Sequence, residues 1–476
     1  MKTVFILMDS LNRHYLSFYG GSQVRTPNLD RLAARGLVFD NHWSGSLPCM
    51  PARKEIMTGR LNFLETSWHQ LEPYEVAYPE VLRKAGVHSH MITDHYHYFH
   101  AGGEGYVDTF STWEFIRGQE SDKWRPVVGP TRTSTLMERG GASYWGNRQL
   151  MDKEDDLAYP TPQCFQQAVE FLEINKDADD WHLQLEVFDP HEPFNCPQRY
   201  LDALGDDWDP DPSQQFDWPN YEAVTQDERT VKHVQTAYAA TLMMADAWLG
   251  KFLDKMDEHD RWADTTVILT TDHGHLLGEH GYWAKNYMYD YQELAHLPMI
   301  VAAPDLAPGR TSALTTTIDL MPSILDLHGA AIPATTQGKS IRPVLGGATT
   351  HHDYVLYGYH GKDVSITDGR YTYTRQPDTD VPIWTYTATP RRSQSTAERE
   401  VGTYLPWTDW QLFRYPCASR RHTDAPDHHL LYDLQADPTQ QSPIRDDATE
   451  SVWADRLRIA LQDAQAPDWQ YTRLGL

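Results

Sequence analysis

The segment TVFILMDS, residues 3–10, is a run of six apolar or β-branched residues that ends in Asp9 and Ser10. A second segment, TTVILTTDHG at residues 265–274, ends in the same way with Asp272 and His273. Short, nearly continuous apolar runs are typical of parallel strands that are buried on both faces of a sheet. Ligands of such sheets bind beyond the carboxyl ends of the strands. Both segments therefore place polar side chains where a site is expected.

Strand patterns alternate with helical patterns up to about residue 345, which is typical of a sheet covered by helices on both faces. We predict an α/β domain over residues 1–345, with a large mixed, mainly parallel sheet sandwiched by helices. Its strands are expected at residues 3–8, 87–93, 181–188, 265–271 and 298–303, and its helices at 28–35, 164–173 and 231–256.

Composition changes after this point, and residues 346–476 are predicted to form a smaller α+β subdomain with an antiparallel sheet. A turn at Asp368-Gly369 separates two alternating runs. The strands are expected at residues 354–359, 363–374 and 430–434, a closing helix at 451–462, and a long loop at 377–400.

The charge balance excludes several classes of protein. The 476 residues contain 41 Lys and Arg against 67 Asp and Glu, a formal charge of −26, which argues against a nucleic-acid partner. No apolar stretch approaches the ~20 residues that span a bilayer, so no membrane partner is expected. The N-terminus lacks the pattern of a signal peptide, and we predict a cytoplasmic protein. The oligomeric state cannot be read from the sequence.

The cysteines give no support for a disulfide framework or a structural zinc site. No two of them form a C-x-x-C pair, and wide spacing predicts free thiols. They are Cys49, Cys164, Cys196 and Cys417.

Asp9 and Asp272 are predicted to lie at the same edge of the sheet. Two carboxylates brought together there would repel unless a cation lies between them, which favours a divalent-metal site. The alternative is that each carboxylate caps the N-terminus of a helix.

The segment SLPCMPAR, residues 46–53, introduces a helix. Pro51 suits the first turn and Gly59 the end of this helix, so Cys49 falls at or just before its N-terminus, where free N–H groups favour an anion. Arg53 follows one turn later on the same side. The alternative for a lone cysteine is a small buried apolar residue.

With these motifs in order, the sequence resembles the sulfatase family of the alkaline-phosphatase superfamily. The pattern Cys49-x-Pro51-x-Arg53 is that family's signature for oxidation of the cysteine to formylglycine. The resemblance extends over nearly the whole chain. Its other motifs are TPNLDRLA at 26–33, GLVF at 36–39, FDPHEPF at 188–194, TDHG at 271–274, GEHG at 278–281 with Lys285, DLMPSIL at 319–325 and LYDLQADP at 431–438.

The resemblance implies a metal bound by Asp9, Asp272, His273 and the modified side chain of Cys49. Oxygen ligands favour Ca²⁺, while the imidazole of His273 leaves Mn²⁺ as an alternative. It also implies a formylglycine-generating enzyme as the partner that matures Cys49.

The same resemblance implies roles for four further residues. Arg53 is expected to steady the hydrated formylglycine, and Lys285 to bind the sulfuryl oxygens. His191 is expected to protonate the leaving oxygen, and His97 matches a catalytic histidine of the family.

Two positions depart from the family pattern. Ser10 stands where the family has a second acidic ligand, so one anionic ligand is missing. Asp94 stands where many relatives carry a lysine, and we predict that Asp94 and His95 contact substrate. Such a change indicates a substrate class different from simple aryl sulfates. The alternative is that Asp94 only orients His95 or His97.

We therefore predict metal-dependent hydrolysis of a sulfate ester, such as a sulfated sugar or another small organic sulfate. The net charge disfavours tracking along a polyanion, which favours a small or terminal carbohydrate sulfate ester. The first alternative is a phosphonate monoester or phosphodiester hydrolase on the same scaffold. The second is a binding protein without turnover, which is expected to lose the nucleophile or the strand-end aspartates.

Overall fold

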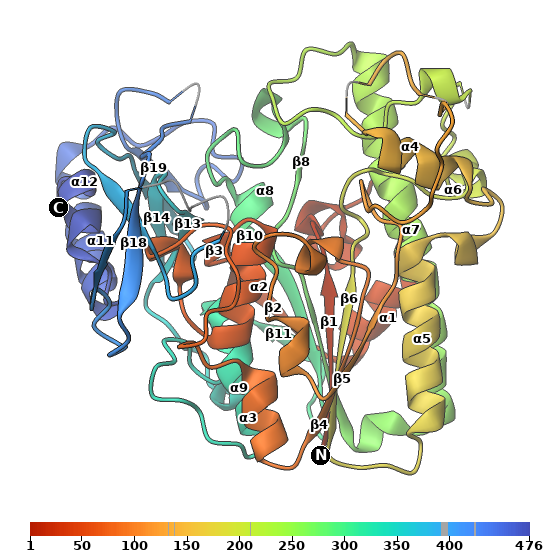
Figure 1. Cartoon of the computed structure of the whole chain (residues 1–476), viewed down its shortest axis with the longest axis horizontal. Helices are drawn as coiled ribbons and strands as arrows, with labels where there is room; N and C mark the ends of the chain where they lie inside the picture. Colours follow the sequence, from red (N-terminus) through yellow and green to blue (C-terminus); the bar gives the residue numbers. More distant parts are fainter. Residues whose placement is uncertain (132, 138, 210, 392–397, 423–424) are drawn as a thin grey trace.

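The computed structural model describes residues 1–131, 133–137, 139–209, 211–391, 398–422 and 425–476. A nine-stranded mixed sheet forms its centre (Figure 1). From one edge to the other its strands are β11 (Gly309–Thr311), β2 (Leu37–Trp43), β10 (His296–Ala302), β7 (Thr265–Thr270), β1 (Lys2–Met8), β6 (Trp181–Val187), β4 (His88–Thr93) and β5 (Thr112–Phe115), with β12 (Thr315–Thr316) also paired to β2.

Five neighbouring strands of this sheet, from β7 to β5, are parallel. β1 lies between β6 and β7, and β4 pairs with both β6 and β5. The direction changes at β10, which is antiparallel to β7 and to β2. The carboxyl ends of β1, β4, β6 and β7 therefore meet at one edge, as the sequence predicted.

Side chains of β1 alternate between two hydrophobic layers. Val4, Ile6 and Met8 belong to one apolar cluster, while Phe5 and Leu7 belong to the other. This alternation follows from the two-residue period of a strand. The first layer is covered by α1 (Pro27–Arg35), α5 (Pro160–Ile174) and α7 (Glu228–Glu258), and the second by α2 (Cys49–Thr58), α3 (Tyr78–Lys84), α9 (Leu320–Leu327) and α10 (Arg342–Leu345).

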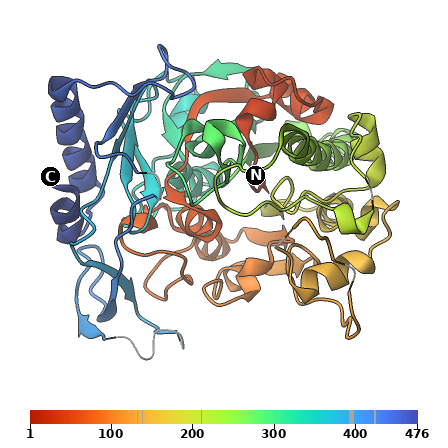
Figure 2. The ribbon, with the colours of Figure 1, turned by 90° about the horizontal axis from the view of Figure 1, so that it is seen from above.

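The C-terminal part lies beside the large sheet and contains an antiparallel sheet of its own (Figure 2). Its apolar face packs against α11 (Asp447–Asp463), where Trp453, Leu457 and Leu461 are buried. The strand order is β19 (Leu430–Asp433), β15 (Tyr371–Arg375), β14 (Val364–Thr367), β13 (Val355–Tyr359) and β3 (Ser46–Leu47).

One strand of this second sheet comes from the N-terminal part of the chain. β3 pairs in parallel with β13 and ends two residues before Cys49. The C-terminal sheet thus holds the segment that leads into α2. The division at residue 345 stays a prediction.

The expected long loop at residues 377–400 is wrong in part. Residues Ile383–Thr387 form β16, which pairs with β18 (Leu412–Cys417), and β18 pairs with β17 (Glu400–Gly402). All residues of this strand except Trp384 are buried. Residues 392–397 of the expected loop lie outside the described residues.

The remaining elements are short and lie mostly in connections. They are α4 (Ala142–Gln149), α6 (Gln198–Ala203), α8 (Gln292–Ala295), α12 (Asp468–Leu474), β8 (Leu276–Leu277) and β9 (Trp283–Ala284).

Two sequence expectations about the chain as a whole have counterparts in the structure. All four cysteines are free thiols, as predicted. Among the described residues, no helix has the length and apolar character needed to traverse a bilayer.

Candidate active site

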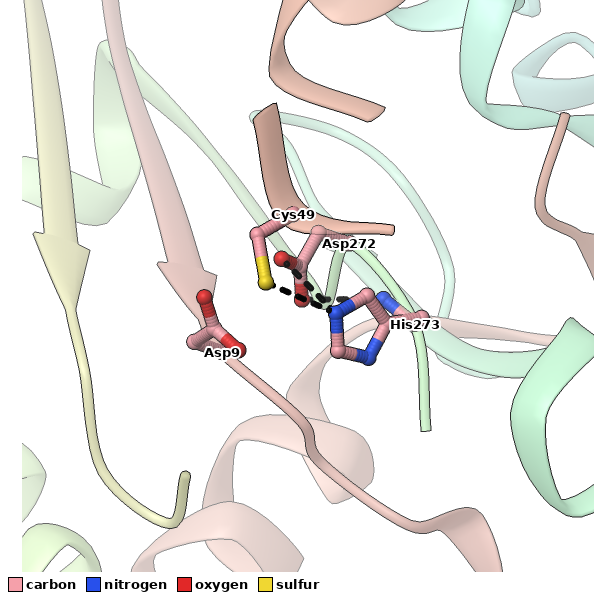
Figure 3. A group of neighbouring side chains, drawn as sticks. All are labelled: Asp9, Cys49, Asp272 and His273. Carbon is pink, nitrogen blue, oxygen red and sulfur yellow. Dashed lines mark hydrogen bonds and ion pairs between the residues drawn. The ribbon is translucent and has the colours of Figure 1, made fainter. Parts of the chain in front are cut away.

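Four predicted residues converge at the carboxyl edge of the sheet (Figure 3). Asp9 follows β1, Asp272 and His273 follow β7, and Cys49 is the first residue of α2. One side-chain ligand atom from each lies within 4.8 Å of the others, and all four residues are buried. The Sγ atom of Cys49 is 3.2 Å from Nε2 of His273. Two carboxylates, an imidazole and a sulfur are thus gathered at one point.

The turn after β7 depends on a glycine. A Cβ atom at Gly274 would lie 1.8 Å from the carbonyl oxygen of Glu293, so no other residue fits without a shift of the backbone. Gly274 N–H donates to Leu294 O, and Gly274 O lies 2.8 Å from Nδ1 of His273. This contact orients the ring so that Nε2 faces Cys49.

The guanidinium of Arg53 contacts carboxylates at or near the ends of three strands and is almost fully buried. It lies 3.0 Å from Asp9 Oδ2, 2.6 Å from Asp272 Oδ2 and 2.9 Å from Glu186 Oε2. It also donates to Cys49 O at 3.3 Å. Although burial acts in the opposite direction, Arg53 and then Lys285 lower the pKa of Asp9 and keep it ionised.

Lys285 completes the surroundings of the cysteine. Its Nζ atom is 3.3 Å from Cys49 Sγ, 3.2 Å from His273 Nε2 and 2.8 Å from His191 Nε2. Burial lowers the pKa of this ammonium, but nearby carboxylates, among them Glu192 and Asp9, raise it above its usual value overall. Lys285 is therefore charged, and it donates a hydrogen bond to an unprotonated Nε2 of His191.

The unmodified thiol of Cys49 is held in its neutral form. Burial raises its pKa well above the usual value, against the opposing effect of Lys285. Because the thiolate rather than the thiol is the nucleophile, this environment does not activate an ordinary cysteine.

Two glutamates that the sequence analysis gave no role surround His191. Its Nδ1 atom lies 3.3 Å from Glu192 Oε2 and 3.7 Å from Glu120 Oε1. Glu192 Oε2 is also 3.4 Å from His275 Nδ1, and Glu120 Oε2 accepts from Tyr96 OH at 2.5 Å. Glu192 lies in the quoted FDPHEPF motif, but Glu120 follows an edge strand and carries no local signal.

Glu186 was also missed, although a signal for it exists. It is a charged residue inside the buried strand β6, where Gln184 is polar as well. Glu186 accepts hydrogen bonds from Arg53 and from Tyr98 OH, the latter at 2.8 Å. A carboxylate within a buried strand requires a buried cation, and Arg53 was the available candidate.

Ser10 occupies the position of the absent acidic ligand. Its hydroxyl donates to Asp9 Oδ1 at 2.9 Å, and its backbone N–H donates to Asp272 Oδ1 at 3.2 Å. The hydroxyl also accepts from Lys285 at 3.4 Å. Ser10 therefore links the two strand-end carboxylates without adding a charge.

Asp94 is not exposed to a cleft in which a sugar could contact it. It is fully buried, and its carboxylate accepts from Gln119 Nε2 at 2.8 Å, Thr161 Oγ1 at 3.1 Å and Phe188 N at 2.8 Å. These contacts join the end of β4 to the start of the loop that carries His191. The geometry favours a positioning role for Asp94.

His95 lies beside Asp9, and His97 lies beside Glu120. The buried His95 places Nδ1 3.7 Å from Asp9 Oδ2 and makes no hydrogen bond through either ring nitrogen to described residues. Burial lowers its pKa well below the usual range, so the ring is neutral. His97 is partly exposed and contacts Glu120 Oε2 at 3.3 Å. Glu120 thus links His97 to His191.

The family assignment follows from comparison of the whole sequence. The sulfatase family model matches residues 2–330, and the chain belongs to this family. It is a sulfuric ester hydrolase, and the resemblance stated above is confirmed. The choline-sulfatase of Rhizobium meliloti (strain 1021) is 24% identical over 414 residues, with 78% of this chain and 77% of the relative covered. The N-acetylglucosamine-6-O-sulfatase of Bacteroides thetaiotaomicron is 23% identical over 421 residues, with 72% and 70% covered.

Solved structures confirm the predicted fold class. A protein in complex with its substrate D-glucosamine-2-N,6-O-disulfate matches with a TM-score of 0.69 at 17% identity, covering 98% of each chain. The phosphonate monoester hydrolase of Agrobacterium radiobacter matches with a TM-score of 0.68 at 16% identity, covering 97% of this chain and 96% of that one. At these identities the likeness concerns the fold alone.

The positioning role of Asp94 predicts the outcome of Asp94→Asn. The amide retains one acceptor oxygen but turns a donor toward groups that already donate, so the loop with His191 shifts. We expect kcat to fall about tenfold, the equivalent of one hydrogen bond of ~1.4 kcal/mol, equally on an aryl sulfate and a carbohydrate sulfate. Steady-state kinetics on both substrates measures this. Gln119→Met, which removes one donor to the same carboxylate, is the matched variant and should act in the same direction. A rise in KM confined to the carbohydrate sulfate would instead support a direct sugar contact.

Proposed function

We propose that this sulfatase hydrolyses a small or terminal carbohydrate sulfate ester through a formylglycine made from Cys49, with a divalent cation at the same edge of the sheet. The observation that carries the proposal is the position of Cys49. It begins a helix, and its sulfur lies among His273, Lys285 and two strand-end carboxylates. A nucleophile at this point would meet an anionic ester beside the ammonium of Lys285 and the proposed divalent cation.

The side chains present fit a divalent cation. Asp9 Oδ2 is fully buried, and its ion pair with Arg53 at 3.0 Å lacks the geometry of a hydrogen bond, which leaves the oxygen able to bind an ion. The carboxylates of Asp9, Asp272 and Glu186 all surround the single guanidinium of Arg53, so negative charge is in excess around it. Asp9, Asp272, His273 and position 49 would hold the ion, which supplies positive charge beside the nucleophile. Oxygen ligands favour Ca²⁺, and the imidazole permits Mn²⁺.

The proposed formylglycine explains why a cysteine lies in surroundings that keep it protonated. Oxidised by a formylglycine-generating enzyme and hydrated, position 49 would offer two hydroxyls on one carbon, one for attack on sulfur and one for release of sulfate. An unmodified cysteine has one S–H group and no hydroxyl on the same carbon that could release the sulfate. Arg53, which already contacts Cys49 O and both strand-end carboxylates, would hold the side chain in line.

Lys285 and His191 are placed to bind the ester and to move a proton. In the free site Lys285 donates to Nε2 of His191, so the ring carries its proton on Nδ1, toward Glu192 and Glu120. Burial lowers the pKa of His191 to about 3, with Glu192 opposing and Lys285 adding to this shift. An anionic sulfuryl group would draw Lys285 away from Nε2. His191 would then take up a proton from solvent at the freed Nε2, with the two glutamates stabilising the imidazolium, and would pass that proton to the leaving oxygen.

The substrate class is supported by relatives and by charge. One relative is named for N-acetylglucosamine-6-O-sulfate chemistry, and one structural neighbour is bound to a glucosamine disulfate. A chain with a formal charge of −26 would be repelled by a long polyanion. The alternative, a phosphonate monoester or phosphodiester hydrolase, is supported by the comparable fold match to a phosphonate monoester hydrolase.

A substrate panel tests the proposed function. We expect kcat/KM for a monosaccharide sulfate to exceed that for a phosphonate monoester or a phosphodiester by at least ~100-fold, because the buried polar groups are matched to one leaving group. Released sulfate and released alcohol are measured with purified enzyme matured by a formylglycine-generating enzyme. Cys49→Ala serves as the blank for every substrate. A preference for the phosphonate ester would contradict the proposal and favour the alternative.

Removal and return of metal tests the cation. We expect a chelator to abolish turnover and Ca²⁺ or Mn²⁺ to restore it, since the buried carboxylates lose their counter-charge. Ser10→Asp should bind the ion more tightly than wild type, because it adds an anionic ligand between Asp9 and Asp272. Ser10→Asn, of the same size without the charge, should not. Turnover that persists in chelator, with no metal in the protein by mass spectrometry, would rule the cation out.

A further inference from the structure

A second group of possible ligands, separate from the site around Cys49, surrounds Asp319. This Asp319 cluster consists of Asp319, His351 and His352, and one ligand atom from each lies within 4.8 Å of the others. Asp319 immediately precedes α9, and the two histidines belong to the segment that leads into β13. The cluster thus connects the large α/β part to the C-terminal sheet.

The carboxylate of Asp319 is fixed from the backbone. It accepts from Thr316 N at 2.9 Å and from Lys339 N at 2.8 Å, and its side chain is only 1% exposed. Nε2 of His352 lies 2.9 and 3.0 Å from its two oxygens, and Nε2 of His351 lies 3.3 Å from Oδ2. Two imidazoles therefore present the same ring nitrogen to one immobile carboxylate.

His351 has no good bond of its own in this arrangement. Its side chain is 5% exposed, yet Nε2 makes no hydrogen bond within the described residues. Its nearest acceptor, Asp319 Oδ2 at 3.3 Å, is not aligned for a hydrogen bond, and a metal ligand bond would give this buried nitrogen a better partner. Nε2 of His352, in contrast, is already hydrogen-bonded to Asp319, at 2.9 and 3.0 Å.

A third histidine stands close by. Nδ1 of the fully buried His42 is 3.0 Å from Thr315 Oγ1, while its Nε2 has no partner among the described residues. Burial lowers the pKa of His42 to about 3, and Asp319 and His351 are among the charged groups that act on this ring. A neutral imidazole with one nitrogen bonded to a hydroxyl and the other without a hydrogen bond is in the state that metal-binding histidines adopt. His42 itself lies outside the group of three ligand atoms.

We propose that the Asp319 cluster is a second metal site, which takes a transition metal of the Zn²⁺ type. Two histidine nitrogens and one carboxylate oxygen form a donor set that suits Zn²⁺, with a fourth position for water. Access is available because His352, Thr316 and Lys339 line a cavity of about 490 Å³. This site goes beyond the proposed sulfate ester chemistry and does not depend on it.

The role of this metal would be to brace the catalytic helix. Thr317, two residues before Asp319, donates to Glu55 of α2, which also accepts from Gly45 N at 3.1 Å and Ser46 N at 2.5 Å. A metal at the Asp319 cluster would therefore tie the turn that holds Glu55 to the segment entering β13. Loss of the ion should loosen the region next to α2 without removing a group that touches substrate.

Metal titration of the full chain tests the site. Co²⁺ is added to chelator-treated Asp272→Asn protein, in which the site around Cys49 is weakened, and the visible absorption bands of four-coordinate cobalt are recorded. We expect such bands, one Zn²⁺ equivalent by elemental analysis and a higher melting temperature with Zn²⁺. The double variant His351→Gln and His352→Gln, in the same background, should lose all three signals.

The matched control is His428→Gln with His429→Gln, another adjacent histidine pair, which lies beside Asp427 and Glu450. This control should keep the bands and the Zn²⁺ response. Unchanged Zn²⁺ binding in the His351 and His352 variant would overturn the proposal. So would an absence of Co²⁺ bands in the Asp272→Asn protein itself, a result that does not require the double variant to fold. Failure of the substrate panel leaves this test unaffected, because its signals do not involve turnover.

Discussion

The guanidinium of Arg53 is the contact on which the site depends most. It is buried among carboxylates from the ends of β1 and β7 and from within β6, and it also holds the first carbonyl of α2. Removing one partner of a buried charge network costs about 3–5 kcal/mol, because the remaining charges stay unpaired. The same group therefore fixes the strand edge, the start of α2 and the position of Cys49. The sheet places the carboxylates, and Arg53 makes their proximity tolerable.

The chemistry around this centre is built from groups that are each perturbed by burial. The thiol of Cys49 stays protonated, His191 stays neutral, and Lys285 stays charged through its acidic neighbours. An anionic ester changes this balance, since it competes with His191 for Lys285. Ser10 leaves the centre one negative charge poorer than an acidic residue would, which favours binding of an anion at some cost in metal affinity.

Much of this arrangement could be predicted from local sequence. Apolar runs that end in Asp9 and Asp272 predicted both the parallel sheet and the shared edge, and Pro51 and Gly59 predicted the bounds of the helix after Cys49. Contacts between distant segments could not be predicted. Glu120 reaches His191 from an edge-strand connection, and β3 joins a sheet made by residues more than 300 positions later. The surroundings of Asp94 could not be predicted either, because its partners Gln119, Thr161 and Phe188 belong to three other segments.

Position 49 is proposed to act only after oxidation, so turnover should depend on how much of the cysteine has been converted. Preparations made with different amounts of a formylglycine-generating enzyme are analysed by peptide mass spectrometry for the fraction of formylglycine, and their kcat is measured on one sulfate ester. We expect kcat to rise in proportion to this fraction and to extrapolate to zero for the unmodified thiol. Full turnover in a preparation that contains only cysteine would contradict this expectation.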